Sequence, residues 1–155
     1  MAGGTPEHGR LAARMAAALA RAIVGRPCET FSSDVRVRVL ATDFTSYPDL
    51  SVVCGKLETA PDDPNAIVNP IVLVEILSAG TERYDRADKF AQYRRIPSLR
   101  EYILVSQGER RIEVYRRRDD AEWSLSEAGP GEVAVLRALD ATVAVDAVYE
   151  TALRG

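Results

Sequence analysis

The chain has 155 residues and a formal net charge of −3 at pH 7, with 46% hydrophobic and 28% charged residues. This length fits one domain around a single core, and these proportions are ordinary for globular proteins. The longest apolar stretch, 11–24, is interrupted by Arg14 and Arg21, and the first residues lack the basic and apolar regions of a secretory signal, so contact with a membrane is not expected. We expect one domain over residues 1–155, located in the cytoplasm.

The first half of the chain predicts one helix and two strands. Apolar residues recur at helical spacing over 11–24, and Gly25 and Pro27 end the run. Alternating valines and arginines over 34–40 predict a half-exposed strand. A second strand is expected over 49–54, whereas 59–70, rich in proline and aspartate, is expected to be a loop.

The second half predicts a central strand, a helix and then a series of strands. Residues 71–77 are apolar on both faces except at Glu75, which is typical of a strand covered on both sides. The later elements are a helix over 82–96, strands over 101–106, 111–117, 122–126 and 132–135, hairpin turns at Gln107-Gly108 and Asp119-Asp120, and a closing helix over 145–153. Together they predict a mixed α/β domain, a sheet flanked by helices whose later strands form an antiparallel meander.

The two cysteines, Cys28 and Cys54, each lie in or beside an apolar stretch. Two cysteines make a poor disulfide framework, and free cysteine is among the most buried residue types. We therefore expect both to be buried, reduced thiols, in keeping with a cytoplasmic location.

Positive charge is concentrated in one segment. Residues 83–118 carry eleven basic and five acidic side chains, a net charge of +6, which leaves −9 for the remainder. Such a polarised chain can present a basic face to phosphates, although a solvated surface is the alternative for any one arginine. The candidate nucleic-acid contacts are Arg83, Arg86, Arg94 and Arg95.

Glu75 and Asp49 are the strongest candidates for a metal site. Glu75 would lose most of its hydration within an apolar strand, which is costly without a cation or strong donors, so a metal site or a structural ion pair is expected there. Asp49 follows Pro48 directly before a strand, a position that turn chemistry alone also explains. Two carboxylates on neighbouring strands, together with the carbonyl of Ile76, would form the oxygen shell that Mg²⁺ or Mn²⁺ prefers.

Lys89 is one of two lysines in the chain and shares a helix face with Asp85 and Tyr93 at spacings of four residues. A phosphodiester hydrolase needs a cation of this kind to stabilise the negative charge that develops during reaction. The alternative is an ordinary Asp–Lys pair on a helix surface.

The ordered set of motifs resembles the Uma2 family, also known as domain of unknown function 820. The motifs are Tyr47-Pro-Asp-Leu-Ser-Val-Val-Cys54, Val74-Glu-Ile-Leu-Ser78, Thr81, Asp85, Lys89, Tyr93 and Glu101-Tyr-Ile-Leu-Val105. The likeness extends over about residues 4–148. It implies a restriction-endonuclease-like fold, built around a Pro-Asp … Asp/Glu-x-Lys signature.

The resemblance also implies roles for single residues. Asp49 and Glu75 match the metal-binding acids, and the usual lysine two positions after the second acid would fall at Leu77. In sequences similar to Uma2 a lysine on the following helix takes its place, and Lys89 matches it. Asp85 and Tyr93 match the positions that accompany this lysine. His8 matches a histidine at the start of an early helix, where a helix-start or packing role is an equal alternative.

The chain differs from typical Uma2 sequences at its start, where a preceding helix and hairpin with a glutamate are expected. Loss of this segment would remove a residue from the metal site or expose a strand edge, and an exposed edge favours a homodimer.

The leading hypothesis is a Mg²⁺- or Mn²⁺-dependent endonuclease that acts on DNA rather than RNA. The alternatives are a catalytically inactive nucleic-acid-binding or scaffold protein with the same fold, and a protein-interaction subunit without affinity for nucleic acid. Metal-dependent cleavage and salt-sensitive binding to DNA distinguish the three.

Overall fold

The main feature of the structure, a computed structural model that describes residues 4–119 and 122–154, is a six-stranded mixed sheet. Its order is β1-β4-β7-β8-β9-β10, in which β7 and β8 are parallel and all other neighbours antiparallel. The strands are Cys28–Ser32 (β1), Leu50–Cys54 (β4), Val72–Ile76 (β7), Glu101–Val105 (β8), Ile112–Arg117 (β9) and Trp123–Ala128 (β10). The predicted mixed α/β fold is confirmed, and β8, β9 and β10 form the expected meander.

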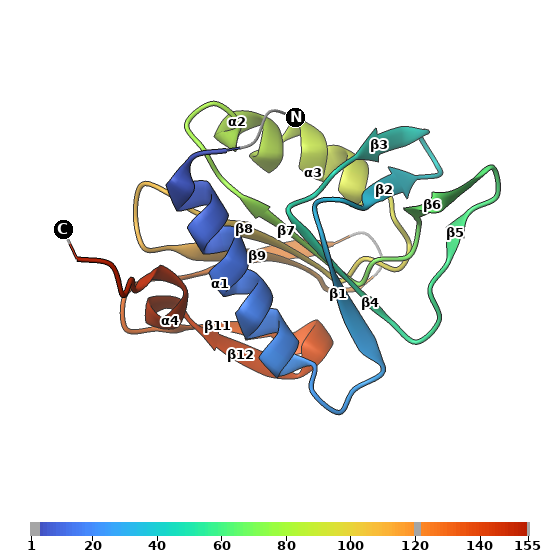
Figure 1. Cartoon of the computed structure of the whole chain (residues 1–155). Coiled ribbons are helices and arrows are strands. Elements are labelled where there is room, and N and C mark those ends of the chain that lie inside the picture. The colour runs from blue at the N-terminus through green and yellow to red at the C-terminus, as the bar shows by residue number, and fades with distance from the viewer. Residues whose placement is uncertain (1–3, 120–121, 155) are drawn as a thin grey trace.

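One face of this sheet is covered by helix α1 (Pro6–Ala22), which lies across the strands in Figure 1. Leu11, Met15 and Leu19 follow one another at four-residue spacing, and all three are buried against the sheet. A hairpin and a short helix complete this layer. The hairpin consists of β11 (Val133–Leu136) and β12 (Ala141–Ala144), with the 3-10 turn η1 (Arg137–Leu139) between them, and the helix is α4 (Val145–Tyr149).

The other face packs against two short helices and a smaller sheet. The smaller sheet has the order β3-β2-β6-β5, and the elements are β2 (Arg36–Val39), β3 (Phe44–Ser46), β5 (Thr59–Ala60), β6 (Asp63–Ile67), α2 (Glu82–Arg86) and α3 (Asp88–Tyr93). Leu73 of β7 and Leu77, the residue after this strand, belong to this second core together with Tyr93. Because side chains alternate along a strand, Glu75 points to the same face as these two leucines.

Strand β7 is the central, covered strand that the sequence predicts. All five of its residues are buried, and it lies between β4 and β8. Val72, Val74 and Ile76 pack on the α1 side, whereas Leu73 packs on the α3 side. The predicted alternation is therefore confirmed over the strand itself, and Ile71, one residue before it, packs on the α1 side.

The prediction of a loop over 59–70 is wrong, because this segment contains the strands β5 and β6. Strand β6 pairs parallel with β2, and the guanidinium of Arg36 forms two hydrogen bonds with the Asp63 carboxylate, 2.7 and 2.8 Å long. Asp63 and Pro64 favour turns, but their contacts with β2 override this local preference.

The expected helix over 82–96 is two helices instead. Ala87, with φ −111° and ψ −72°, caps the end of one helix and the start of the next, so Asp85 belongs to α2 and Lys89 to α3. Strands β1, β3 and β12 have no counterpart among the predicted elements. The turn at Asp119-Asp120 lies partly outside the described residues.

The expectation of reduced thiols is also wrong, because Cys28 and Cys54 form a disulfide. The antiparallel pairing of β1 with β4 places them directly opposite each other, with their Cα atoms 4.0 Å apart. The support that free thiols gave to a cytoplasmic location therefore falls away. Within the described parts of the chain, no helix has both the length and the apolar character needed to cross a membrane.

Candidate active site

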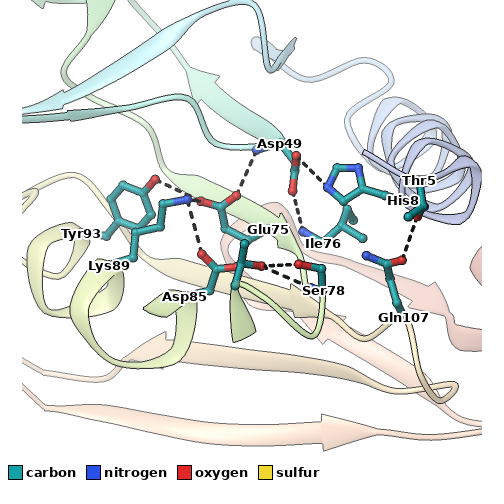
Figure 2. Close-up of polar contacts among 11 residues, drawn as sticks. Thr5, His8, Asp49, Glu75, Ile76, Ser78, Asp85, Lys89, Tyr93 and Gln107 are labelled. Carbon is teal, nitrogen blue, oxygen red and sulfur yellow. Dashed lines mark hydrogen bonds and ion pairs between the residues drawn. The ribbon is translucent and has the colours of Figure 1, made fainter. Parts of the chain in front are cut away.

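The sequence-predicted acids and lysine meet at a cavity of about 290 Å³, beyond the end of β7 and beside the first turn of α1. Its acidic and basic lining residues are His8, Asp49, Glu75, Asp85 and Lys89, and Ile76 also lines it. Figure 2 shows these side chains converging from α1, β7, α2, α3 and the residue before β4. Tyr93 contacts Glu75 from α3.

Asp49 is positioned by the pairing of β4 with β7. Leu50 lies opposite Val74 in this antiparallel pair, so Asp49 comes next to Glu75 at the end of the ladder. The backbone N–H of Ile76 donates to Oδ2 of Asp49 over 2.7 Å, and the N–H of Asp49 donates to Oε1 of Glu75 over 3.3 Å. The main chain of the two strands therefore holds both carboxylates at one edge of the cavity.

Glu75 is almost completely buried, with 3% of its surface exposed. Its Oε2 lies 2.6 Å from Nζ of Lys89 and accepts a hydrogen bond of 3.1 Å from the hydroxyl of Tyr93. Burial raises the pKa of Glu75 from 4.5 to about 7; Lys89 opposes this rise, whereas Asp49 and Asp85 add to it. A cation placed beside this carboxylate would offset its lost hydration.

Lys89 contacts two acids at once. Besides Glu75, its Nζ lies 3.4 Å from Oδ1 of Asp85. Burial alone would lower the pKa of Lys89, but the charges and hydrogen bonds of Glu75 and Asp85 outweigh it and raise this pKa. For Asp85, burial is the largest effect, and it raises the pKa of the carboxyl. Lys89 therefore does not form only an ordinary Asp–Lys pair on a helix surface, because its ammonium group also contacts the Glu75 carboxylate on the central strand.

Tyr93 links Glu75 to the second core. Its hydroxyl lies 2.5 Å from Oγ of Ser46 on β3, and its ring meets Phe44 and Tyr102 edge to face. Burial raises the pKa of Tyr93 well above 10, so the hydroxyl keeps its proton and donates to Glu75. The predicted common face of Asp85, Lys89 and Tyr93 persists across the break at Ala87.

His8 reaches the cavity from the first turn of α1. Its Nε2 lies 3.3 Å from Oδ1 of Asp49, while its backbone N–H donates to the hydroxyl of Thr5, the N-cap of the helix. A Cβ at Gly4 would lie 3.0 Å from Cγ of His8, so glycine leaves the imidazole its place. His8 therefore takes part in the helix start through its main chain and in the site through its side chain.

Other lining residues have no counterpart in the sequence-based prediction of the site. Thr5 donates from Oγ1 to Oε1 of Gln107 over 3.2 Å, a contact that closes the cavity between α1 and the loop after β8. Gln107 carries only a turn pattern in the sequence, and Ser46 carries none. Ser78 and Thr81 also line the cavity, with their hydroxyl oxygens 3.0 Å apart.

None of the four arginines proposed as nucleic-acid contacts lines the described wall of this cavity. Arg86 forms hydrogen bonds with Glu113 on β9 and with Glu82, and its pKa is raised, chiefly by Glu113. Arg94 lies over the ring of Phe90. Arg83 and Arg95 are exposed on the α2–α3 side of the sheet, where contact with nucleic acid stays a prediction.

The donors at this site fit a hard divalent cation in type, but they do not form a complete shell. Among residues 4–119 and 122–154, no three side chains of His, Cys, Asp or Glu gather into a metal-binding group. Asp49 and Glu75 offer carboxylate oxygens side by side, the ligands that Mg²⁺ and Mn²⁺ prefer. Main-chain oxygens, water or a bound phosphate would complete the coordination.

Comparison with known proteins gives consistent results. The model of the Uma2 family, described as "Putative restriction endonuclease", matches residues 1–146. The chain is similar to two proteins of Synechocystis sp. PCC 6803, "Uncharacterized protein slr1290" and "Uncharacterized protein sll1609". They are 31% and 33% identical to it; the alignments cover 96% and 82% of this chain and 77% and 72% of the relatives.

A solved structure shares the fold. It is the crystal structure of a putative nuclease belonging to DUF820 from Anabaena variabilis, with a TM-score of 0.74. The match covers 94% of this chain and 82% of the other at 14% sequence identity, so it bears on the fold alone.

Proposed function

Since this chain belongs to the Uma2 family of putative restriction endonucleases, we propose that it is a metal-dependent endonuclease that hydrolyses phosphodiester bonds of DNA. The observation that carries the proposal is the meeting of Asp49, Glu75 and Lys89 in one cavity. Nuclease chemistry needs ligands for a hard cation and a positive group near the phosphate. This cavity offers both.

Asp49 and Glu75, with the carbonyl of Ile76, would hold Mg²⁺ or Mn²⁺. When bound, the ion neutralises charge on the phosphate and lowers the pKa of the attacking water. Asp49 is oriented for this role by the N–H of Ile76 and by His8. Glu75 is oriented by the N–H of Asp49 and by the hydroxyl of Tyr93.

Lys89 would stabilise the negative charge that develops on the phosphate. Its ammonium group is confined between Glu75 and Asp85, so its position is set before substrate arrives. Asp85 acts as a positioning residue that keeps the ammonium in the cavity when Glu75 contacts a metal ion. The raised pKa of Lys89 keeps it charged at neutral pH.

A nucleic-acid-binding or scaffold protein that does not cleave is the second candidate. It is favoured by the contacts of Glu75, whose two oxygens already receive bonds from Asp49, Lys89 and Tyr93 without any metal. Such an arrangement is also what a purely structural buried ion pair requires.

Cleavage of supercoiled plasmid by the purified protein in Mn²⁺ tests the proposal. Asp49→Ala, an EDTA control and Asp34→Ala, which changes an exposed aspartate outside the cavity, accompany the wild type. We expect the wild type and Asp34→Ala to nick the plasmid in Mn²⁺. Addition of EDTA should abolish this nicking, and Asp49→Ala should not nick the plasmid. A folded wild type that binds DNA but never cleaves it would favour the second candidate.

A further inference from the structure

A second and larger cavity, of about 620 Å³, lies at the opposite end of the central strands. It is lined by the residues at the starts of β7 and β8 and by those at the end of β9. Ile71, in its wall, lies four positions before Glu75 in the chain, or roughly 13 Å along an extended strand. The two cavities are therefore distinct, and no group proposed for hydrolysis lines the larger one.

This larger cavity is strongly basic. Five arginines line it, against two acidic residues, Glu101 and Asp119, so its described wall carries a formal net charge of +3 in a chain whose net charge is −3. The arginines are Arg100, Arg116, Arg117, Arg118 and Arg137. Concentrated positive charge of this kind attracts anions.

The buried acid of the wall, Glu101, pairs with only one of these arginines in the described part of the chain. Glu101 is fully buried and accepts bonds from Nε of Arg116, 2.8 Å long, and from the backbone N–H groups of Arg137 and Ala138, 3.0 and 3.1 Å long. It therefore balances the charge of Arg116. The side chains of Arg100, Arg118 and Arg137 are exposed and have no ion-pair or hydrogen-bond partner within the described residues.

Two of the five arginines are held rigidly. Arg116 donates to the carbonyl of Val135 as well as to Glu101. Arg117 donates to the carbonyls of Leu99 and Ile96 and lies over the ring of Trp123, 4.6 Å from its centroid. Burial lowers the pKa of Arg117, and the positive charges of Arg100 and Arg94 lower it further.

We propose that this cavity binds the phosphate groups of a polyanionic ligand. Guanidinium groups match phosphate oxygens with two parallel hydrogen bonds, and three of the five have no side-chain partner in the described part of the chain. Because several arginines line one cavity of about 620 Å³, we infer a ligand with more than one phosphate. The same chemistry is offered by a nucleic-acid strand and by a free polyphosphate or nucleotide, and the proposal is independent of cleavage in the smaller cavity.

Binding measurements on the full chain in EDTA test the proposal without any contribution from cleavage. Tripolyphosphate is titrated by calorimetry, and a fluorescein-labelled 20-nucleotide DNA strand is followed by anisotropy. The test variant carries both Arg100→Gln and Arg118→Gln. The matched control is Arg21→Gln, which changes an exposed arginine on α1. We expect the double variant to weaken binding about tenfold or more, and the control to leave it unchanged.

A variant in the opposite direction guards against a folding defect. Asp119→Asn removes an exposed negative charge from the wall, so it should tighten binding severalfold, which a damaged protein would not do. Each variant is also compared with the wild type by thermal unfolding.

The two probes identify the source of the phosphate. If the double variant weakens both probes and tripolyphosphate displaces the DNA, the ligand is nucleic acid; if it weakens tripolyphosphate alone, the ligand is a free polyphosphate or nucleotide. Affinities of the double variant equal to those of the wild type and Arg21→Gln, or binding of neither probe by the wild type, would overturn the proposal.

Discussion

Nζ of Lys89 on α3 lies 2.6 Å from Oε2 of Glu75 on β7, so a lysine of a helix forms an ion pair with a carboxylate of the central strand. Sequence spacing on the helix alone cannot establish this contact, which depends on how α3 packs on the sheet. It is the geometric basis of the proposed catalytic role of Lys89.

Replacement of Lys89 by methionine should abolish most cleavage and leave binding of DNA intact. Methionine keeps much of the side-chain length and loses the charge, so the loss of transition-state stabilisation should lower kcat about 100-fold or more. Plasmid cleavage and anisotropy with labelled DNA measure the two effects. Lys56→Met, at the exposed second lysine of the chain, is the matched control. Equal cleavage by the two variants would exclude a catalytic role for Lys89.

Addition of Mn²⁺ should raise the melting temperature of the wild type. An ion that binds only the folded protein stabilises it by about 2.7 kcal/mol at 100 times its Kd, or about 5–10 °C for a chain of this size. Asp49→Asn should lose most of this shift, because its amide still accepts from Ile76 but binds cations weakly. Asp34→Asn should keep the shift, and a shift of full size in Asp49→Asn would place the ion elsewhere.

The buried Glu75 should make folding less favourable as the pH rises. Its pKa is raised by burial from 4.5 to about 7, so the folded state holds the proton more tightly than the unfolded chain. The stability that the protonated Glu75 contributes is fully present below about pH 4.5, and it is lost as the pH rises through about 7.

Glu75→Gln removes this dependence. Without metal, we compare the free energy of unfolding of the variant with that of the wild type. We expect this difference to shift in favour of the variant by about 2 kcal/mol when the pH is raised from 5 to 8. Urea unfolding at both pH values measures the difference, and Glu29→Gln, at an exposed glutamate of β1, is the control. The same stability difference at both pH values would show that Glu75 titrates normally.

Reduction of the disulfide should destabilise the protein. Cys28 and Cys54 are separated by 26 positions, and opening a loop of this size costs about 3 kcal/mol. Denaturant unfolding with and without dithiothreitol measures the change, and the Cys28→Ala/Cys54→Ala variant should not respond to the reductant. Two free thiols in the untreated, denatured protein would contradict the bond.

The central part of the fold could be predicted from the sequence because local pattern and tertiary environment agree there. The run around Glu75 is apolar on both faces, and β7 is buried on both faces. Glu75 itself was recognisable because a lone carboxylate in such a strand needs a partner.

The elements that were missed depend on pairing across the chain. Asp63-Pro64 favours a turn locally, but Arg36 and the parallel pairing with β2 hold it in β6. The disulfide follows from the register of β1 against β4, and β1 was not predicted as a strand. The break at Ala87 has no glycine or proline beside it, so nothing in the sequence indicates it.

The start of α1 gives the smaller cavity a wall that can move without unfolding the sheet. Thr5 is the N-cap of this helix and His8 lies in its first turn, and hydrogen bonds at helix ends open more readily than those of a buried sheet. Transient fraying of this turn would carry His8 away from Asp49 and break the contact of Thr5 with Gln107. Amide exchange in the first turn of α1 therefore reports the opening of the cavity, and a ligand that contacts His8 and Asp49 together should slow it.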